Sequence, residues 1–155
     1  MVVVASTGRG VCAVRIGQDP EPLIARLREE FPLADLERDD GSLQSVASIL
    51  EDALRGSGDA TSLPLDVQGT AFQIRVWEAL RRIERGTTQT YSEVAATIGS
   101  PSAVRAVASA CAANPAALTI PCHRVVRKDG SLGGYRWGLA TKRALLDAES
   151  SGSPA

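Results

Sequence analysis

Signals that start and stop helices divide the second half of the chain into short helices, and they constrain the fold more than any other feature of the sequence. Thr70 is a helix-capping residue, and Gly86 is a residue that ends helices. Between them lies an apolar stripe at helical spacing: Phe72, Val76, Trp77, Leu80 and Ile83. We therefore expect a helix of about four turns, with this stripe in the core.

Two further short helices are expected in close succession. The run Thr-Tyr-Ser-Glu at 90–93 has the T-x-x-E form of a capping box and opens a helix that Gly99 ends. Ser-Pro at 100–101 is the expected cap of the next helix, which Asn-Pro at 114–115 stops. Two short helices joined by Gly-Ser-Pro predict a helix-turn-helix.

The first 68 residues predict a small α/β unit. β-branched runs at 2–5 and 11–16 are joined by a turn-rich linker, which is typical of a hairpin. The other expected elements are a short helix after Pro22, a short strand over 33–38, a helix over 43–54 and an extended segment over 63–67.

The charge balance changes sign near Gly69, which is also the best candidate for a domain boundary. Residues 1–68 carry 6 Lys and Arg against 12 Asp and Glu (−6), whereas residues 69–155 carry 11 against 6 (+5), which together give the net charge of −1. A basic half suits phosphates, although solvated charged faces are common. We expect an α/β domain over 1–68, a mostly helical domain over 69–150 and a flexible tail over 151–155.

Composition and cysteine spacing exclude several classes. With 44% hydrophobic and 23% charged residues, the chain is neither disordered nor fibrous. No apolar stretch approaches the roughly 18 residues of a membrane helix, and the apolar start lacks the basic flank of a secretory signal. We expect no membrane association and a cytoplasmic location. Cys12, Cys111 and Cys122 fit neither a disulfide framework nor a zinc site, which favours reduced thiols and no metal or cofactor.

The run Pro-Cys-His-Arg-Val at 121–125 places the only histidine of the chain directly after a cysteine. A thiol is a nucleophile only as thiolate, and its ordinary pKa of about 8.5 leaves little of that form at neutral pH without a base or a positive charge nearby. His123 and Arg124 could supply both. A buried structural cysteine explains the pair about equally well, so other features must decide.

Three segments around this pair extend the pattern. An alanine-rich helix with Arg105 as its only charge is slim enough to approach another surface closely, either a neighbouring helix or a DNA groove. The apolar run 116–120 predicts a buried extended segment that delivers the thiol to a cleft. Residues 131–138 interleave glycine with aromatic and basic residues, which suits a loop around a planar ligand, and 139–149 predict a closing amphipathic helix.

The chain closely resembles the O6-methylguanine-DNA methyltransferase family, most of all its bacterial adaptive-response branch. The resemblance is dense from about Gly69 to Glu149, and it is carried by four motifs: Pro-Cys-His-Arg-Val at 121–125, Ala-Val-Arg-Ala-Val at 103–107, Asn-Pro at 114–115 and Gly-Gly-Tyr-Arg-Trp-Gly at 133–138. It implies a ribonuclease H-like N-terminal α/β domain and a winged-helix-like C-terminal domain.

The resemblance implies DNA repair by direct transfer of an alkyl group from O6 of guanine, and also from O4 of thymine, to a cysteine that is consumed in the reaction. Cys122 is the implied acceptor, His123 takes the thiol proton through a water, and Glu149 orients His123. Tyr91 corresponds to the proton donor to guanine N3, and Asn114 to the hinge asparagine.

The implied partner is double-stranded DNA that holds an alkylated guanine, approached from the minor groove by a monomer that is associated with the bacterial nucleoid when bound. The nucleotide must rotate out of the stack, and Arg105 corresponds to the residue that fills its space. The implied DNA contacts are Tyr91, Ala103, Arg105, Ala106 and Arg124, and the implied base pocket is formed by Val125, Leu132, Gly133, Tyr135 and Arg136.

Two departures from the family and three rival classes stay open at this point. Family members of this branch usually have a strand before the 2–5 run, and often a zinc-binding regulatory domain, of which this sequence shows nothing. The rivals are a lesion binder without repair activity, which Cys122 argues against, a cysteine hydrolase built on Cys122, His123 and Glu149, and a winged-helix regulator in which the thiol is inert.

Overall fold

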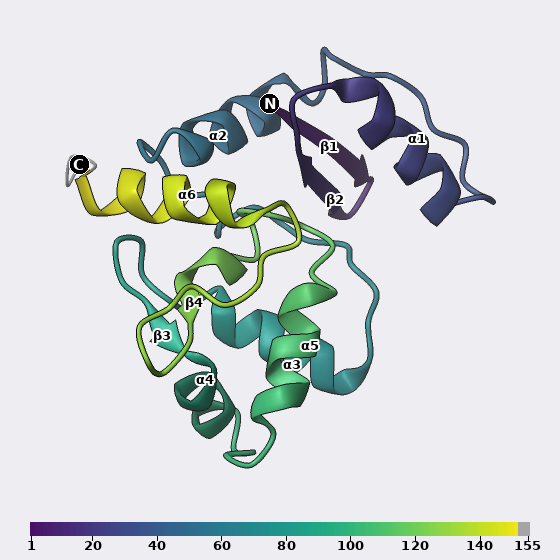
Figure 1. Cartoon of the computed structure of the whole chain (residues 1–155). Helices are drawn as coiled ribbons and strands as arrows, with labels where there is room; N and C mark the ends of the chain where they lie inside the picture. The colour runs from purple at the N-terminus through teal and green to yellow at the C-terminus, as the bar shows by residue number, and fades with distance from the viewer. Residues whose placement is uncertain (152–155) are drawn as a thin grey trace.

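The computed structural model describes residues 1–151; most of the tail expected over 151–155 lies outside the described residues. The described part of the chain is a mixed α/β structure of six α-helices, one 3-10 helix and two small two-stranded sheets. In Figure 1 the N-terminal hairpin and first two helices form an upper layer, and the next three helices form a lower one. No helix of residues 1–151 is long and apolar enough to span a membrane.

The upper layer is built on an antiparallel hairpin of β1 (Val2–Thr7) and β2 (Gly10–Ile16), as predicted. It is followed by α1 (Pro20–Glu30), which Asp19 caps, and α2 (Gln44–Leu54), both close to their predicted places. The segment 63–67 is extended and bridges to β2, since Leu65 lies beside Val11.

The strand predicted over 33–38 is wrong. The chain makes a turn after α1, where the N–H of Ala34 donates to the carbonyl of Phe31, and it continues without regular structure. Leu33 is fully exposed, because no neighbouring strand lies there to pair with this segment and cover its side chains.

The lower layer contains three short helices. Helix α3 (Ala71–Leu80) begins with a capping box between Thr70 and Gln73 and ends in turns well before Gly86, so it is shorter than predicted. Helix α4 (Tyr91–Thr97) is capped by Thr90 as expected. Helix α5 (Val104–Ala112) begins a few residues after the Ser-Pro pair and ends before Asn114. Helices α4 and α5 pack on each other and on α3.

The segment that leads to the thiol is buried but not extended, which corrects the prediction for 116–120. Ala116 bridges to Val14 of β2, and the chain then turns, with Leu118 in the left-handed region at a φ of 69°. A 3-10 helix, η1 (Cys122–Arg124), follows, and β4 (Val125–Val126) pairs in parallel with β3 (Gln89–Thr90).

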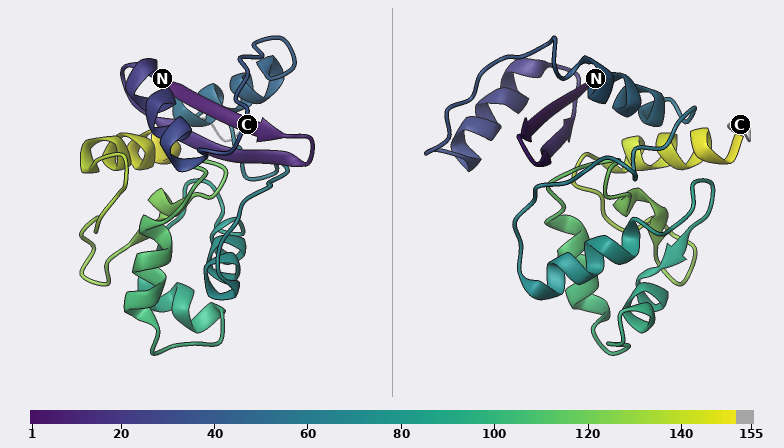
Figure 2. Two further views of the ribbon diagram at one scale, coloured as in Figure 1. Left: turned by 90° about the vertical axis from the view of Figure 1, so that its right-hand side faces the viewer. Right: turned by 180° about the vertical axis from the view of Figure 1, so that it is seen from behind.

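The last helix, α6 (Leu139–Ser151), lies between the two layers, as both views of Figure 2 show. Its approach to the loop after α2 is close, because a Cβ on Gly56 would lie 2.6 Å from the Cβ of Ala148. One buried cluster contains residues from both sides of Gly69 in the sequence. Val14 and Leu50 come from the first 68 residues, and Val76 and Leu145 come from the second half. The two layers therefore share a core.

Candidate active site

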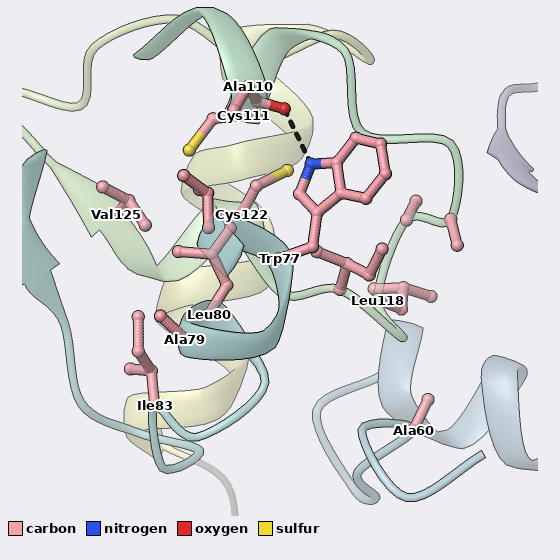
Figure 3. Close-up of a cluster of buried hydrophobic side chains, with 14 of the residues drawn as sticks. Ala60, Trp77, Ala79, Leu80, Ile83, Ala110, Cys111, Leu118, Cys122 and Val125 are labelled. Atoms are coloured by element: carbon pink, nitrogen blue, oxygen red, sulfur yellow. Dashed lines mark hydrogen bonds between the residues drawn. The ribbon is translucent and has the colours of Figure 1, made fainter. Parts of the chain in front are cut away.

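Cys122 lies at the wall of a cavity of about 310 Å³, and its side chain is 4% exposed. Figure 3 shows the thiol in the cluster between Trp77, Cys111 and Val125, where the indole N–H of Trp77 donates to the carbonyl of Ala110. The cavity is lined by α4, α5, η1 and the loop after β4, through Tyr91, Ala108, Cys111, Ala112, Cys122, Gly134, Tyr135 and Arg136. The structure thus brings Tyr91, Tyr135 and Arg136 to the thiol.

Asn114 fastens the thiol segment to the end of α5. Its side-chain amide donates to the carbonyl of Ile120 at 2.7 Å and to the sulfur of Cys122 at 3.1 Å, and its oxygen accepts the N–H of Ala116 at 2.8 Å. The side chain is fully buried, so these bonds have no competition from water. This geometry fits the hinge expected at this position.

His123 and Glu149 form a buried pair. The ring Nε2 of His123 lies 2.7 Å from Oε1 of Glu149, and Arg124 donates to the same carboxylate through Nε and Nη2. Burial acts to raise the pKa of Glu149, but the hydrogen bonds and charges of His123 and Arg124 outweigh it and hold the pKa at about 2. Burial, together with the charges of Arg124 and Lys142, lowers the pKa of His123 against the raising effect of Glu149. A neutral His123 therefore donates from Nε2 and keeps a free lone pair on Nδ1.

Two buried polar atoms near the thiol have no hydrogen-bond partner: Nδ1 of His123 and the hydroxyl of Tyr135. The rings of these two residues lie edge to face, with centroids 6.5 Å apart. Buried polar groups are normally paired with protein or ordered water, so each of these two atoms can still form a hydrogen bond with a further partner.

The thiol is protonated in this surrounding. Burial raises the pKa of Cys122 to about 11, against the lowering effects of the Asn114 amide and of Lys142. Burial and the neighbouring thiols of Cys111 and Cys122 also raise the pKa of Tyr91 to about 12, so its hydroxyl keeps its proton and can donate it.

Lys142 is a site residue that the sequence analysis missed. Its ammonium group is fully buried and donates to the carbonyls of Val125 at 2.7 Å, of Gly134 at 3.2 Å and of Leu132, which fixes the loop that covers the cavity. A signal was present, because Lys142, Leu145 and Glu149 share one face of α6.

Gly133 allows the loop to approach Tyr91. Its φ is 72°, and a Cβ at this position would lie 2.8 Å from the Tyr91 hydroxyl oxygen. Leu132 is half-buried beside it, and Val125 is buried on β4. The predicted pocket residues therefore lie together on one loop and one strand around the thiol.

The predicted DNA contacts separate into two groups. Arg105 and Ala106 are exposed on α5, and Ala103 is half-buried at its start. Arg124 is only 2% exposed, because its guanidinium is held by Glu149 and by the carbonyl of Ile83. The expectation that Arg124 contacts DNA is therefore wrong for this structure: it supports Glu149 from within the protein.

Residues 1–151 contain no group of three or more His, Cys, Asp or Glu side chains arranged to hold a metal ion. The three cysteines Cys12, Cys111 and Cys122 are free thiols.

Comparison with known proteins places these features in a family. Residues 71–151, more than half of the chain, match the sequence model described as 6-O-methylguanine DNA methyltransferase, DNA binding domain. The bifunctional transcriptional activator/DNA repair enzyme Ada of Escherichia coli is 49% identical over 148 residues, which are 96% of this chain and 42% of that protein. The inducible methylated-DNA--protein-cysteine methyltransferase of Bacillus subtilis is 42% identical over 151 residues, 97% of this chain and 84% of that protein.

A solved structure agrees with these sequence relatives. The crystal structure of Mycobacterium tuberculosis OGT in complex with DNA superimposes with a TM-score of 0.79 at 35% identity, and covers 99% of this chain and 89% of that chain. The present chain spans only about two fifths of the length of Ada but most of the length of the Bacillus and Mycobacterium proteins. On both sequence and structure, the chain belongs to the 6-O-methylguanine DNA methyltransferase family.

Proposed function

We propose that this protein repairs DNA as a methylated-DNA–protein-cysteine methyltransferase, by moving an alkyl group from O6 of guanine to the sulfur of Cys122. The observation that carries the proposal is a free thiol at the wall of a cavity, with a hinge amide on its sulfur and a His–Glu pair on the next residue. The name of the Bacillus relative supports this reaction, and the DNA complex of the Mycobacterium relative supports DNA as the partner.

The thiol proton must leave before sulfur can attack. In the proposed sequence, a water held by Nδ1 of His123 takes this proton to the imidazole, and Glu149 stabilises the imidazolium that forms. The hydroxyl of Tyr135 is placed to be a further partner of that water. Each group has the protonation state that its role needs, because His123 starts neutral and Glu149 stays ionised.

The displacement itself forms one bond and breaks one. The thiolate of Cys122 attacks the alkyl carbon, the bond from that carbon to O6 breaks, and the electron pair goes to the purine. The Tyr91 hydroxyl gives its proton to N3, so guanine leaves uncharged. The sulfur becomes a thioether, which has no easy leaving group, and we propose that each molecule therefore acts once. O4 of thymine presents a similar alkyl–oxygen bond and is a second proposed substrate.

For the DNA complex, we propose that the α4–α5 pair acts as a helix-turn-helix of a winged-helix-like domain, under a ribonuclease H-like N-terminal layer. The exposed, slim start of α5 enters the minor groove as part of a monomer, and Arg105 fills the space of the rotated nucleotide. Within the pocket, Tyr135 flanks the base, the backbone N–H of Arg136 binds O6, and the carbonyls of Cys122 and Val125 accept the guanine amino group.

The direct test is to mix the protein with a duplex that contains one O6-methylguanine, digest the protein and weigh the peptides. The expected result is one methyl group per molecule on the peptide with Cys122, together with restored guanine. Cys122→Ser should bind the duplex and leave the lesion unchanged. Release of methanol with unmodified protein over many cycles would favour a hydrolase, and undiminished function of Cys122→Ser would favour a regulator.

A further inference from the structure

Glu30 connects two arginines that belong to different layers. One oxygen of its carboxylate pairs with Arg15 on β2, and the other accepts a hydrogen bond from Nη2 of Arg136 at 3.1 Å. Glu30 is the last residue of α1, whereas Arg136 lines the thiol cavity in the loop after β4. A carboxylate of the N-terminal layer thus reaches a residue of the cavity directly.

The same two arginines hold the hinge. Nη1 of Arg136 donates to the carbonyl of Asn114 at 3.0 Å, and Nη1 of Arg15 donates to the carbonyl of the next residue, Pro115. Two consecutive carbonyls are therefore held by two guanidinium groups that share one carboxylate. Because the side chain of Asn114 donates to the sulfur of Cys122, the contacts form an unbroken path from α1 to the thiol.

We infer that Glu30 is a positioning residue for the alkyl-transfer site, which acts through Arg136 and Asn114 on the sulfur of Cys122. This inference rests on the function proposed above. Arg15 is 3% exposed, and a buried guanidinium that loses its carboxylate partner is costly, so Glu30 is the group that keeps both arginines on the hinge. Without it, the half-exposed Arg136 turns to solvent and the Asn114 peptide loses its donor.

Removal of Glu30 has two effects of opposite sign on the thiol. The amide of Asn114 and the charge of Arg136 both lower the pKa of Cys122, so a loosened hinge and a displaced Arg136 raise that pKa. Loss of the negative charge of Glu30, acting directly through space, lowers it. The sign of the change therefore separates an effect relayed by Arg136 and Asn114 from the direct effect of the Glu30 charge. The other groups that face the thiol stay unchanged: Tyr91 on α4, Cys111 on α5, His123 on η1, Tyr135 on the loop and Lys142 on α6.

The test compares Glu30→Gln with the wild type in the reaction with free O6-methylguanine, followed from about pH 7 to about pH 12 so that the range spans the thiol pKa of about 11. Because the free base reacts without DNA, differences in DNA binding do not enter the comparison. Below the thiol pKa we expect the rate to fall about fivefold, the equivalent of about 1 kcal/mol, with the midpoint of the profile displaced to higher pH. Glu29→Gln makes the same charge change at the exposed neighbouring residue and should react like the wild type.

A second background shows whether Glu30 acts through Arg136. In an Arg136→Ala protein, Glu30→Gln should slow the reaction less than it does in the wild type, because only the branch through Arg15 and Pro115 remains. A wild-type rate for Glu30→Gln, a profile displaced to lower pH, or equal slowing in both backgrounds would overturn the inference. If Glu30→Gln does not fold, Glu30→Asp, which is too short to reach both arginines, is measured in its place with the same expectations. A wild-type protein that takes no methyl group refutes the proposed function instead.

Discussion

Replacement of Glu149 by Gln tests whether the charge of this carboxylate, and not only its shape, holds the site together. In the folded protein its pKa is about 2, against an ordinary value of 4.5. A difference of about 2.5 pKa units corresponds to about 3 kcal/mol of stability. Glu149 is 7% exposed, so solvent screens this interaction little. Gln is neutral, like protonated Glu, and at pH 7 the variant should be less stable by about this amount.

The pH dependence gives the sharper result. Because the pKa of Glu149 is lowered on folding, its contribution is complete above about pH 4.5 and is lost as the pH falls toward about 2. The stability difference between wild type and Glu149→Gln should therefore shrink from about 3 kcal/mol near neutral pH to near zero at about pH 2. Urea unfolding followed by tryptophan fluorescence at several pH values measures it.

A matched control separates the pair from general charge effects. Asp147→Asn removes an exposed carboxylate from the same helix and should change stability by less than about 0.5 kcal/mol at every pH. A difference for Glu149→Gln that stays constant with pH would refute the reasoning, because loss of packing or of hydrogen-bond shape does not titrate.

Three further outcomes follow from the site. Arg105→Ala should leave stability within about 0.5 kcal/mol but slow repair of O6-methylguanine in a duplex far more than reaction with the free base; equal slowing would remove its role in base rotation. Lys142→Met should lower the free energy of unfolding by about 1–3 kcal/mol in urea titrations, because it leaves one carbonyl of β4 and two of the loop without their donor. Gly133→Ala should cost about 1–2 kcal/mol of stability in thermal melts and displace Tyr91, whereas Gly8→Ala, whose added Cβ meets nothing within 4 Å, should be neutral in the same assay.

The parts of the fold that the sequence predicts are those set by local chemistry. Thr70 and Thr90 each start a helix because their side chains accept a backbone N–H of the first turn, and Asn114 stops one just before a proline. The hairpin follows from two β-branched runs around a short turn. Such signals act within a few residues, so they do not depend on how distant segments of the chain pack.

The wrong or missing predictions concern contacts between distant segments. Residues 33–38 have the residue types of a strand, but a strand needs a partner edge, which the folded layer does not offer there. The apolar run 116–120 is buried as expected, yet its shape is set by Asn114 and by a bridge to Val14, and it turns. The Glu30–Arg136 pair joins residues that are 106 positions apart in the sequence, and no periodic pattern predicts this contact.

The candidate site shows the same division. Cys122 and His123 are adjacent, so a reactive thiol could be considered from the sequence order, with a buried structural cysteine as an equal alternative, and the family resemblance supplied Tyr91 and Glu149. The resemblance also implied that Arg124 contacts DNA. In the structure, Arg124 is buried and donates to Glu149, because a buried carboxylate needs a second donor beyond one neutral imidazole.

The raised thiol pKa is consistent with the single reaction proposed for Cys122. With a pKa of about 11, very little of this thiol is ionised at pH 7, so electrophiles other than the substrate react with it slowly. In the proposed mechanism, reaction depends on a purine in the cavity, on transfer of the thiol proton to His123 and on a proton given by Tyr91. Burial thus slows reaction of the thiol with electrophiles that do not bind in the cavity. The amide of Asn114 and the charge of Lys142 limit how far burial raises the pKa. A more acidic thiol would be faster against every electrophile, and each such encounter would consume a molecule without repairing a base.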